Sequence, residues 1–186
     1  MLAFEGDSIT DFNVNGGRNG YPWLAYSRTG VSTFFYDFAV SGSGVATMVT
    51  RASLIDAKYD PGKTNNVLFI LIGANNLGGG NAVSFVASLK TYCQARQAVG
   101  WKVVIATILP RTLAGFNVDR NVANSLIVAD PSFYDGLARF DLDAAMGCDA
   151  CAANTTYYPD GTHPSAAGHA ILGPIANAAI YAVLNL

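Results

Sequence analysis

The segment 67–72 constrains the possible folds of this chain more than any other. It reads Val-Leu-Phe-Ile-Leu-Ile and runs directly into Gly73 and then into two amide side chains, Asn75 and Asn76. A short, nearly continuous apolar run that ends at a turn residue is typical of a strand buried on both faces. Such strands belong to parallel sheets that helices cover on either side. The segment therefore predicts a central parallel strand of an α/β protein.

Strand-like and helix-like segments alternate along the rest of the chain. Apolar, β-branched or aromatic runs predict five strands: one that includes residue 1 and ends against Gly6-Asp7-Ser8, and four more at 33–40, 67–72, 101–109 and 138–142. Helical spacing and helix-ending residues predict helices at 20–26, 45–59, 82–99, 119–129 and 166–186. In the second of these helices Val49 is expected on the buried face. The alternation predicts a three-layer α/β/α sandwich with a mostly parallel five-stranded sheet, in one domain that spans residues 1–186.

The composition excludes one class of partner. The chain has 186 residues, of which 51% are hydrophobic, and this supplies enough apolar material for one buried core. It carries 11 basic and 13 acidic residues, a net charge of -2, and no cluster of Lys or Arg that could grip a phosphate backbone. We therefore expect no nucleic acid as a partner.

The apolar C-terminal run could be taken for a membrane span. Polar and helix-breaking residues interrupt it at His169, Pro174 and Asn177, and its large apolar residues recur at helical spacing. We expect a core-facing helix and no membrane span. No basic segment precedes an apolar one near the start, as it would in a signal peptide. The chain is therefore expected in the cytoplasm, or secreted or periplasmic if an upstream export signal has been removed.

Two of the three cysteines, Cys148 and Cys151, have the spacing of a zinc half-site or a redox pair. No second Cys or His pair at ligand spacing accompanies them, so we expect no metal site. A small disulfide within the loop is favoured over two free thiols. Cys93 falls within a helical pattern, where we expect it to pack as an apolar residue.

The first strand-like run ends at the sequence Gly6-Asp7-Ser8, which suits a tight turn. Gly6 can adopt backbone angles that a β-carbon forbids, and Asp7 can bond to neighbouring amides. The turn would present the Ser8 hydroxyl, unburied, at the edge of the sheet where open α/β sheets bind ligands. Gly-Asp-Ser is also common in ordinary turns, so other segments must decide whether Ser8 is a nucleophile.

Three further segments favour the interpretation of Ser8 as a nucleophile. An apolar run breaks at Gly42, the central strand runs into Asn75, and the sequence Asp-Gly-Thr-His-Pro occupies positions 160–164. Together with the Gly-Asp-Ser turn, and in this order, they resemble the SGNH/GDSL family of serine hydrolases. The resemblance covers residues 6–164 and implies the flavodoxin-like SGNH hydrolase fold and a carboxylic ester hydrolase activity. It implies no metal and no organic cofactor.

A serine is a poor nucleophile at neutral pH unless a base takes its proton and a third group orients that base. His163 follows Asp160 by three residues, so the carboxylate can accept the Nδ1 hydrogen and leave Nε2 for Ser8. The resemblance implies these roles: Ser8 is the nucleophile, His163 the general base and then the general acid, and Asp160 the residue that orients it. Taken alone, His163 is more readily explained as a loop residue that caps the helix expected near Ser165. His169 matches no motif and is interpreted as structural.

The resemblance also implies an oxyanion hole, which stabilises the charge that develops on the ester carbonyl oxygen. Its donors would be the backbone N–H of Ser8, the N–H of Gly42 and the side-chain amide of Asn75. The alternatives are that Gly42 is only a turn residue and Asn75 only a strand-end cap. The chain departs from the family at Asn76, where many relatives carry Asp. We expect this change to alter the loop or nearby pKa values and not the mechanism.

Other residues are expected at the same edge of the sheet. The segment 11–20, rich in Gly and Asn, is expected to form one wall of the site. Arg111 and Phe116 are candidates for substrate contact, and Glu5 is expected to form a salt bridge or to line the cleft. The glycines at 78–80 are expected to form a mobile loop without a phosphate-binding role.

Three functions are compatible with these residues. The first is a serine esterase for small acyl esters, and the polar 11–20 segment favours O-acetylated carbohydrate, so the expected partner is a small-molecule or glycan acyl ester. The second is a lysophospholipase or a thioesterase-type lipolytic enzyme, which requires a larger apolar groove such as Phe12, Trp23 and Phe116 would supply. The third is a catalytically idle carbohydrate-binding module, against which the complete set of triad residues argues.

Overall fold

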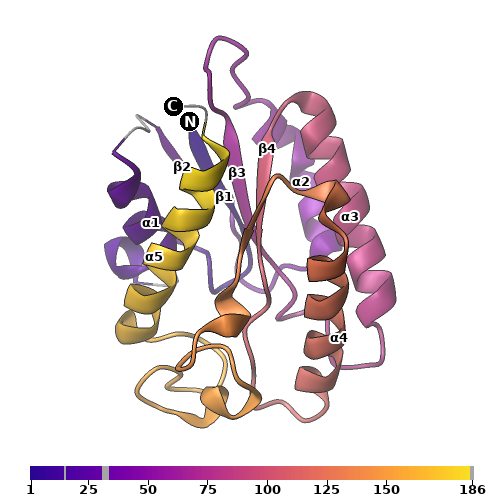
Figure 1. The fold of residues 1–186 in the computed structure, drawn as a ribbon, viewed down its shortest axis with the longest axis vertical. Coiled ribbons are helices and arrows are strands. Elements are labelled where there is room, and N and C mark those ends of the chain that lie inside the picture. The colour runs from indigo at the N-terminus through magenta and orange to yellow at the C-terminus, as the bar shows by residue number, and fades with distance from the viewer. Residues whose placement is uncertain (15, 31–33, 185–186) are drawn as a thin grey trace.

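A parallel sheet of five strands organises the computed structural model, which describes residues 1–14, 16–30 and 34–184 (Figure 1). The strands are β1 Leu2–Gly6, β2 Phe35–Asp37, β3 Val67–Leu71, β4 Lys102–Ala106 and β5 Gly136–Ala138. Their order is β2-β1-β3-β4-β5, and every neighbouring pair is parallel. The predicted flavodoxin-like α/β/α architecture is confirmed.

The order of the strands reverses between β1 and β3. From β1 the chain passes to β2 on one side of the sheet, and from β3 it passes to β4 and β5 on the other. In open α/β sheets the loops on the two sides of such a point diverge and leave a crevice at the carboxyl edge, where ligands bind. Because β1 pairs with β3, the residues that follow these strands, Ser8 and Asn75 among them, emerge at this point.

The two central strands are buried along their whole length. Every residue of β1 and of β3 is buried, as the apolar run 67–72 predicts for β3. Gly6 is required at the end of β1, because a β-carbon there would lie 2.2 Å from the carbonyl oxygen of Leu71. Glycine thus lets β1 pack directly against β3 just before the chain turns at Ser8.

Helices cover both faces of the sheet. They are α1 Tyr21–Thr29, α2 Val45–Asp56, α3 Ala82–Val99, α4 Phe116–Ala129 and α5 Ala166–Val183. Two separate clusters of buried apolar side chains join α2, α3 and α4 to one face and α1 and α5 to the other (Figure 1). Short 3-10 helices lie at Gly17–Asn19, Pro131–Phe133, Phe140–Leu142 and Asp149–Ala153. The predicted site residues lie on loops that follow β1, β2, β3 and β5, at the carboxyl edge of the sheet.

The edge strands are shorter than their predicted bounds. The strand expected at 33–40 covers only Phe35–Asp37, and residue 33 lies outside the described residues. The strand expected at 138–142 is Gly136–Ala138, and a 3-10 turn follows it. This strand begins at a glycine because a β-carbon at Gly136 would lie 2.8 Å from the side chain of Val183 in α5. The strand therefore begins two residues earlier than predicted, at a glycine, which strand propensities do not favour but which the close packing of α5 requires.

Two helices also differ from expectation. Helix α4 begins at Phe116 and not at residue 119, because Gly115 turns the chain with a φ of +77° and Phe116 is fully buried. Val49, expected on the buried face of α2, is 56% exposed. The buried residues of α2 are Val45, Met48 and Ile55, so its buried face is narrower than the apolar pattern suggests.

Helix α5 is the one helix among the described residues that has the length and apolar composition to cross a membrane. Of its apolar window, 44% is buried. It packs against α1 and β5 (Figure 1), and the side chains of Leu172, Ala176 and Ile180 lie in the core. Pro174 lies within the helix and does not end it.

The glycines at 78–80 are held to α4, so the expectation of a mobile loop is wrong. The amides of Gly78, Gly79 and Gly80 donate to Oδ2 of Asp119 at 2.9, 2.8 and 2.8 Å. These hydrogen bonds, that from Gly80 first, lower the pKa of Asp119. Asp119 lies about 40 residues further along the chain, so the local sequence around the glycines could not predict this contact.

The cysteines behave as predicted. Cys148 and Cys151 form a disulfide within the loop that follows β5. Cys93 is a free thiol in α3 that is fully buried in the core, and burial raises its pKa.

Candidate active site

The turn after β1 places Ser8 at the carboxyl edge of the sheet. The carbonyl oxygen of Asp7 accepts hydrogen bonds from the amides of Thr10 and Asp11 at 3.0 and 2.9 Å, and Asp7 Oδ1 accepts one from the Ile9 amide at 3.1 Å. These bonds close a helical turn around the serine. Ser8 is only 8% exposed, so the expectation of an unburied serine is wrong. The part that stays accessible opens into a cavity.

Ser8 and His163 meet across this edge although 155 residues separate them in the sequence. Ser8 Oγ lies 2.7 Å from His163 Nε2, and His163 Nδ1 lies 2.7 Å from Asp160 Oδ2. The carboxylate at Nδ1 assigns the ring proton to that nitrogen, and the Nε2 lone pair then accepts from the serine hydroxyl. The three side chains that the sequence predicts therefore form one hydrogen-bonded line.

Asp160 holds the backbone of the His163 loop as well as the imidazole. Its Oδ1 accepts hydrogen bonds from the amides of His163 and Thr162 at 2.7 and 2.9 Å. Desolvation alone would raise the pKa of Asp160, but the hydrogen bonds from His163 outweigh it and lower the pKa to about 2. Asp160 is therefore ionised at neutral pH. The cap of α5 is Ser165, whose Oγ accepts from the Gly168 amide at 3.2 Å, so His163 is not needed for that role.

Asp7 is a second carboxyl beside the serine. It is 1% exposed, and desolvation raises its pKa to about 6 against the hydrogen bond from Ile9 and the nearby charge of His163. The side chain therefore gains its negative charge close to neutral pH, next to the Ser8 and His163 pair.

The residues predicted for an oxyanion hole lie on two neighbouring loops. Gly42 is exposed and adopts a φ of +80°, which a residue with a β-carbon rarely does. Asn75 is exposed, and its Nδ2 donates to the carbonyl oxygen of Ser43 at 3.0 Å. The side-chain amide is therefore tied to the turn that contains Gly42, and one hydrogen of its two remains for another acceptor.

The side chain of Asn76 joins the loop after β3 to the start of α2, just after the turn that contains Gly42. Its Oδ1 accepts from the amide of Val45, the first residue of α2, at 3.3 Å. Gly44 makes this possible, because a β-carbon there would lie 2.7 Å from Asn76 Nδ2. The N-terminus of α2 has no side-chain cap of its own, so the neutral amide of Asn76 supplies one from the end of β3.

A cavity of about 230 Å³ opens beside Ser8 and His163. Its other lining residues are Ile9, Val14, Gly16, Pro164 and His169. Two of these belong to the 11–20 segment, which thus forms a wall of the cavity as expected. The sequence interpretation treated His169 as structural and did not expect it to line the cavity.

Arg111 joins the two loops that carry Asn75 and His163. Its Nε donates to Thr162 Oγ1 at 3.2 Å, and its Nη1 donates to the carbonyl oxygen of Ala74. Thr162 and Ala74 immediately precede His163 and Asn75 in the sequence. Arg111 was expected as a substrate contact, and the structure gives it these protein partners.

The other candidates for substrate contact pack away from the cavity. Phe116 is fully buried in the core cluster of α4, where the Arg111 guanidinium lies 5.4 Å from its ring centroid, so it offers no exposed surface to a substrate. Phe12 and Trp23 pack edge to face, with ring centroids 6.3 Å apart, and both contact Phe35. Glu5 is buried, and its Oε2 accepts from the Tyr92 hydroxyl at 2.7 Å, so it does not line the cleft.

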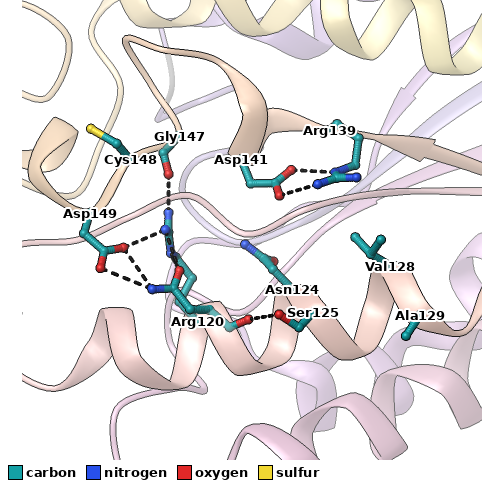
Figure 2. Close-up of a pocket in the computed structure, with 11 residues that line it drawn as sticks. Arg120, Asn124, Ser125, Val128, Ala129, Arg139, Asp141, Gly147, Cys148 and Asp149 are labelled. Carbon is teal, nitrogen blue, oxygen red and sulfur yellow. Dashed lines mark hydrogen bonds and ion pairs between the residues drawn. The ribbon is translucent and has the colours of Figure 1, made fainter.

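A larger cavity, of about 640 Å³, lies between α4 and the loop after β5 and contains none of the predicted catalytic residues (Figure 2). Its charged groups are bonded within the protein. Arg120 donates to the Gly147 carbonyl oxygen at 2.8 Å and pairs with Asp149 at 2.7 Å. Arg139 pairs with Asp141 at 2.8 Å. Since these groups hold one another, we assign this cavity no part in hydrolysis.

Comparison with protein families matches residues 4–171 to the GDSL-like lipase/acylhydrolase family. Among solved structures, the chain is similar to the psychrotrophic esterase EstA from Pseudoalteromonas sp., with 17% identity and a TM-score of 0.71 over 96% of this chain and 95% of that one. A lipolytic protein of the G-D-S-L family from Veillonella parvula aligns with 14% identity and a TM-score of 0.74 over 94% of both chains. The acetylxylan esterase Axe2 from Geobacillus stearothermophilus aligns with 19% identity and a TM-score of 0.65 over 96% of this chain and 93% of that one. No curated protein sequence matches significantly.

At these identities the solved structures establish the fold alone. The family match covers the segments on which the sequence resemblance rests, from β1 to α5. The chain belongs to the GDSL-like lipase/acylhydrolase family and is a carboxylic ester hydrolase.

Proposed function

We propose that the protein is a serine esterase for small acyl esters, with Ser8, His163 and Asp160 as its catalytic triad. The observation that carries the proposal is the pair of 2.7 Å contacts that joins the three side chains. A hydroxyl held by an imidazole, which an ionised carboxylate holds in turn, is the arrangement that activates a serine at neutral pH.

The reaction then follows from the position of each proton. His163 Nε2 takes the proton of Ser8 while Oγ attacks the ester carbonyl carbon, and Asp160 stabilises the imidazolium that forms. Collapse of the tetrahedral intermediate breaks the bond to the alcohol oxygen, which receives the proton from Nε2. Water that loses a proton to the same nitrogen attacks the acyl group on Ser8, releases the carboxylic acid and restores the hydroxyl.

The negative charge on the carbonyl oxygen needs donors fixed in advance. We assign this role to the N–H of Ser8, the N–H of Gly42 and Nδ2 of Asn75. The hydrogen bond from Asn75 to Ser43 supports the assignment, because it holds the amide against the turn at Gly42.

O-acetylated carbohydrate is the substrate class we propose. The cavity beside Ser8 has a volume of about 230 Å³ and is lined in part by Ser8 and two imidazoles, which suits a small polar group of the substrate better than a long hydrocarbon chain. The aromatic side chains that a lipolytic groove would need pack elsewhere. One of the proteins with this fold is an acetylxylan esterase.

A substrate panel tests both parts of the proposal. Acetylated sugars, acyl-nitrophenols of increasing chain length and acyl thioesters are assayed with the wild type and with Ser8→Ala. We expect the wild type to prefer acetyl esters, and Ser8→Ala to lower kcat by about 10⁴-fold or more and to abolish labelling by a fluorophosphonate. Ser27→Ala, which removes a serine whose hydroxyl donates to the Leu24 carbonyl oxygen in its own helix, is the matched control and should change neither result.

Each alternative has its own outcome in this panel. Activity that rises up to acyl chains of about eight carbons would favour the lipolytic enzyme and remove the acetyl preference. Full activity of Ser8→Ala would show that another residue is the nucleophile. If the wild-type protein binds acetylated sugar but hydrolyses none of the esters, the protein is the catalytically idle carbohydrate-binding module.

A further inference from the structure

The cavity beside Ser8 contains a second imidazole, that of His169. The residue is 2% exposed, and its Nδ1 accepts a hydrogen bond from the backbone amide of Tyr21 at 3.2 Å. A backbone amide can only donate, so Nδ1 must carry a lone pair. The hydrogen of the neutral ring therefore sits on Nε2.

The surroundings of His169 keep the ring in this state. The ring of Tyr21 stacks on it, with centroids 6.1 Å apart and planes inclined by 17°. Burial, with a smaller contribution from the charge of His163, lowers the pKa of His169 to about 4. At neutral pH the ring is uncharged and offers one N–H donor in a fixed orientation.

This donor has no partner within the described part of the chain, where Nδ1 makes the one hydrogen bond of the ring. An N–H group without an acceptor costs about 1–3 kcal/mol when it is removed from water. Nε2 of His169 is not fully buried, so an occupant of the cavity can reach it and supply the acceptor in place of water.

The lining of the cavity indicates which half of an ester it receives. Ser8 and His163 line it, whereas neither Gly42 nor Asn75 does. The carbonyl oxygen of the ester must lie towards the oxyanion donors, and the leaving alcohol must lie at His163 Nε2, from which it takes its proton. The cavity is therefore on the alcohol side of the reacting carbon.

We propose that His169 determines specificity for the alcohol half of the ester, by donating a hydrogen bond from Nε2–H to a hydroxyl or ring oxygen of a carbohydrate. This inference rests on the proposed esterase function and names the group that recognises the sugar. An uncharged donor suits an uncharged polyol, whereas a hydrocarbon alcohol would leave the N–H unpaired. Sites built to bond a hydroxyl discriminate strongly against analogues that lack it.

Two variants separate recognition of the sugar from support of α1. His169→Asn keeps an oxygen near the position of Nδ1 for the Tyr21 amide but has no group that reaches the cavity. His169→Gln carries an N–H that reaches about as far as Nε2. The substrates are an acetylated methyl pyranoside and cyclohexyl acetate, which has a ring of the same size without hydroxyl or ring oxygen.

We expect His169→Asn to lower kcat/KM for the pyranoside about 3- to 10-fold, the effect of one neutral hydrogen bond, and to leave cyclohexyl acetate within about twofold. His169→Gln should recover most of the loss. Equal losses on both esters, or a loss on neither, would overturn the role of His169 while leaving the esterase intact. A wild type that cleaves neither ester would overturn the proposed function itself.

A measurement without a substitution at His169 covers the case in which its variants do not fold. In the Ser8→Ala protein, the NMR signal of the His169 Nε2–H should shift and exchange more slowly when the acetylated pyranoside is added. Cyclohexyl acetate should not produce this change. An unchanged signal with the pyranoside bound would overturn the proposal.

Discussion

Asp160 uses both of its carboxylate oxygens on the residue that it orients. Oδ1 accepts from the amides of Thr162 and His163, and Oδ2 accepts from the His163 ring. The backbone bonds set the course of the loop, and the ring bond decides which imidazole nitrogen carries the proton. A side chain with an oxygen at only one of these positions can do one of these tasks and not both.

Asp160→Asn tests this division. If its oxygen replaces Oδ1, its NH₂ group faces Nδ1 and forces the ring proton onto Nε2, where it blocks acceptance from Ser8. We expect kcat to fall about 10²- to 10⁴-fold with little change in thermal unfolding, because the backbone bonds survive. The measurement is acetyl ester hydrolysis together with a melting curve. A kcat close to that of the wild type would mean that Asp160 does not orient the base.

Single residues were predictable from the sequence where they belong to short motifs. Ser8, Asp160 and His163 follow from their local sequence and from its resemblance to a family. His169 could not be predicted, because a histidine in an apolar helix has the same sequence pattern whether it packs in the core or lines a cavity. Its role depends on Tyr21, which lies 148 residues away.

At the scale of elements, Arg111 connects the end of β3 to the loop before α5. Its guanidinium bonds to Ala74 on one side and to Thr162 on the other. The backbone amide of Thr112 adds a third link, to the carbonyl oxygen of Gly161 at 2.9 Å. The segment after β4 thus sets the distance between Asn75 and His163, which come from separate loops.

Arg111→Gln removes this link and keeps a polar side chain. We expect kcat to fall about 10- to 100-fold with a smaller change in KM, because small displacements of reacting groups slow the chemical step. Arg28→Gln loses the same charge from an arginine that donates to the Leu24 carbonyl oxygen in its own helix, and it should leave kcat unchanged. Arg111→Lys should recover part of the loss. If KM rose and kcat stayed constant, Arg111 would contact the substrate and would not position the loops.

Elements were predictable in proportion to their burial. The run that forms β3 is buried on both faces and was located within one residue of its observed end. The edge strands β2 and β5 contain no such run, and contacts with other elements set their bounds, as Val183 does at Gly136. The conformation of the loop at 78–80 depends in the same way on a distant residue, Asp119 of α4, which accepts hydrogen bonds from its three amides.

At the scale of the whole molecule, a buried carboxyl makes stability depend on pH. Glu5 is the one glutamate of the sequence, and it is 2% exposed beneath α3, where it accepts from Tyr92. Desolvation raises its pKa to about 8, against the hydrogen bond from Tyr92. This pKa lies above the value of 4.5 for an unburied glutamate, so the folded protein holds a proton on Glu5 that the unfolded chain loses. The contribution of this proton to the free energy of unfolding is present in acid and is lost as the pH rises through about 8.

We expect the free energy of unfolding to fall by about 2–3 kcal/mol between pH 6 and pH 9 through Glu5. Glu5→Gln should remove most of this slope, because its carbonyl oxygen can still accept from Tyr92 and does not ionise. Urea unfolding of both proteins at the two pH values measures the difference. Identical slopes would mean that Glu5 keeps the same charge in the folded protein at both pH values.

Met1 and Leu184 line one small cavity, at the end of the sheet opposite the triad. Figure 1 shows the start of β1 and the end of α5 together there, and Ser8 follows the other end of β1. A carrier, a solid support or a fused partner attached at either end would therefore leave the entrance to the serine unobstructed. Both attachments could be made at once, since they would share the side of the molecule that substrate does not approach.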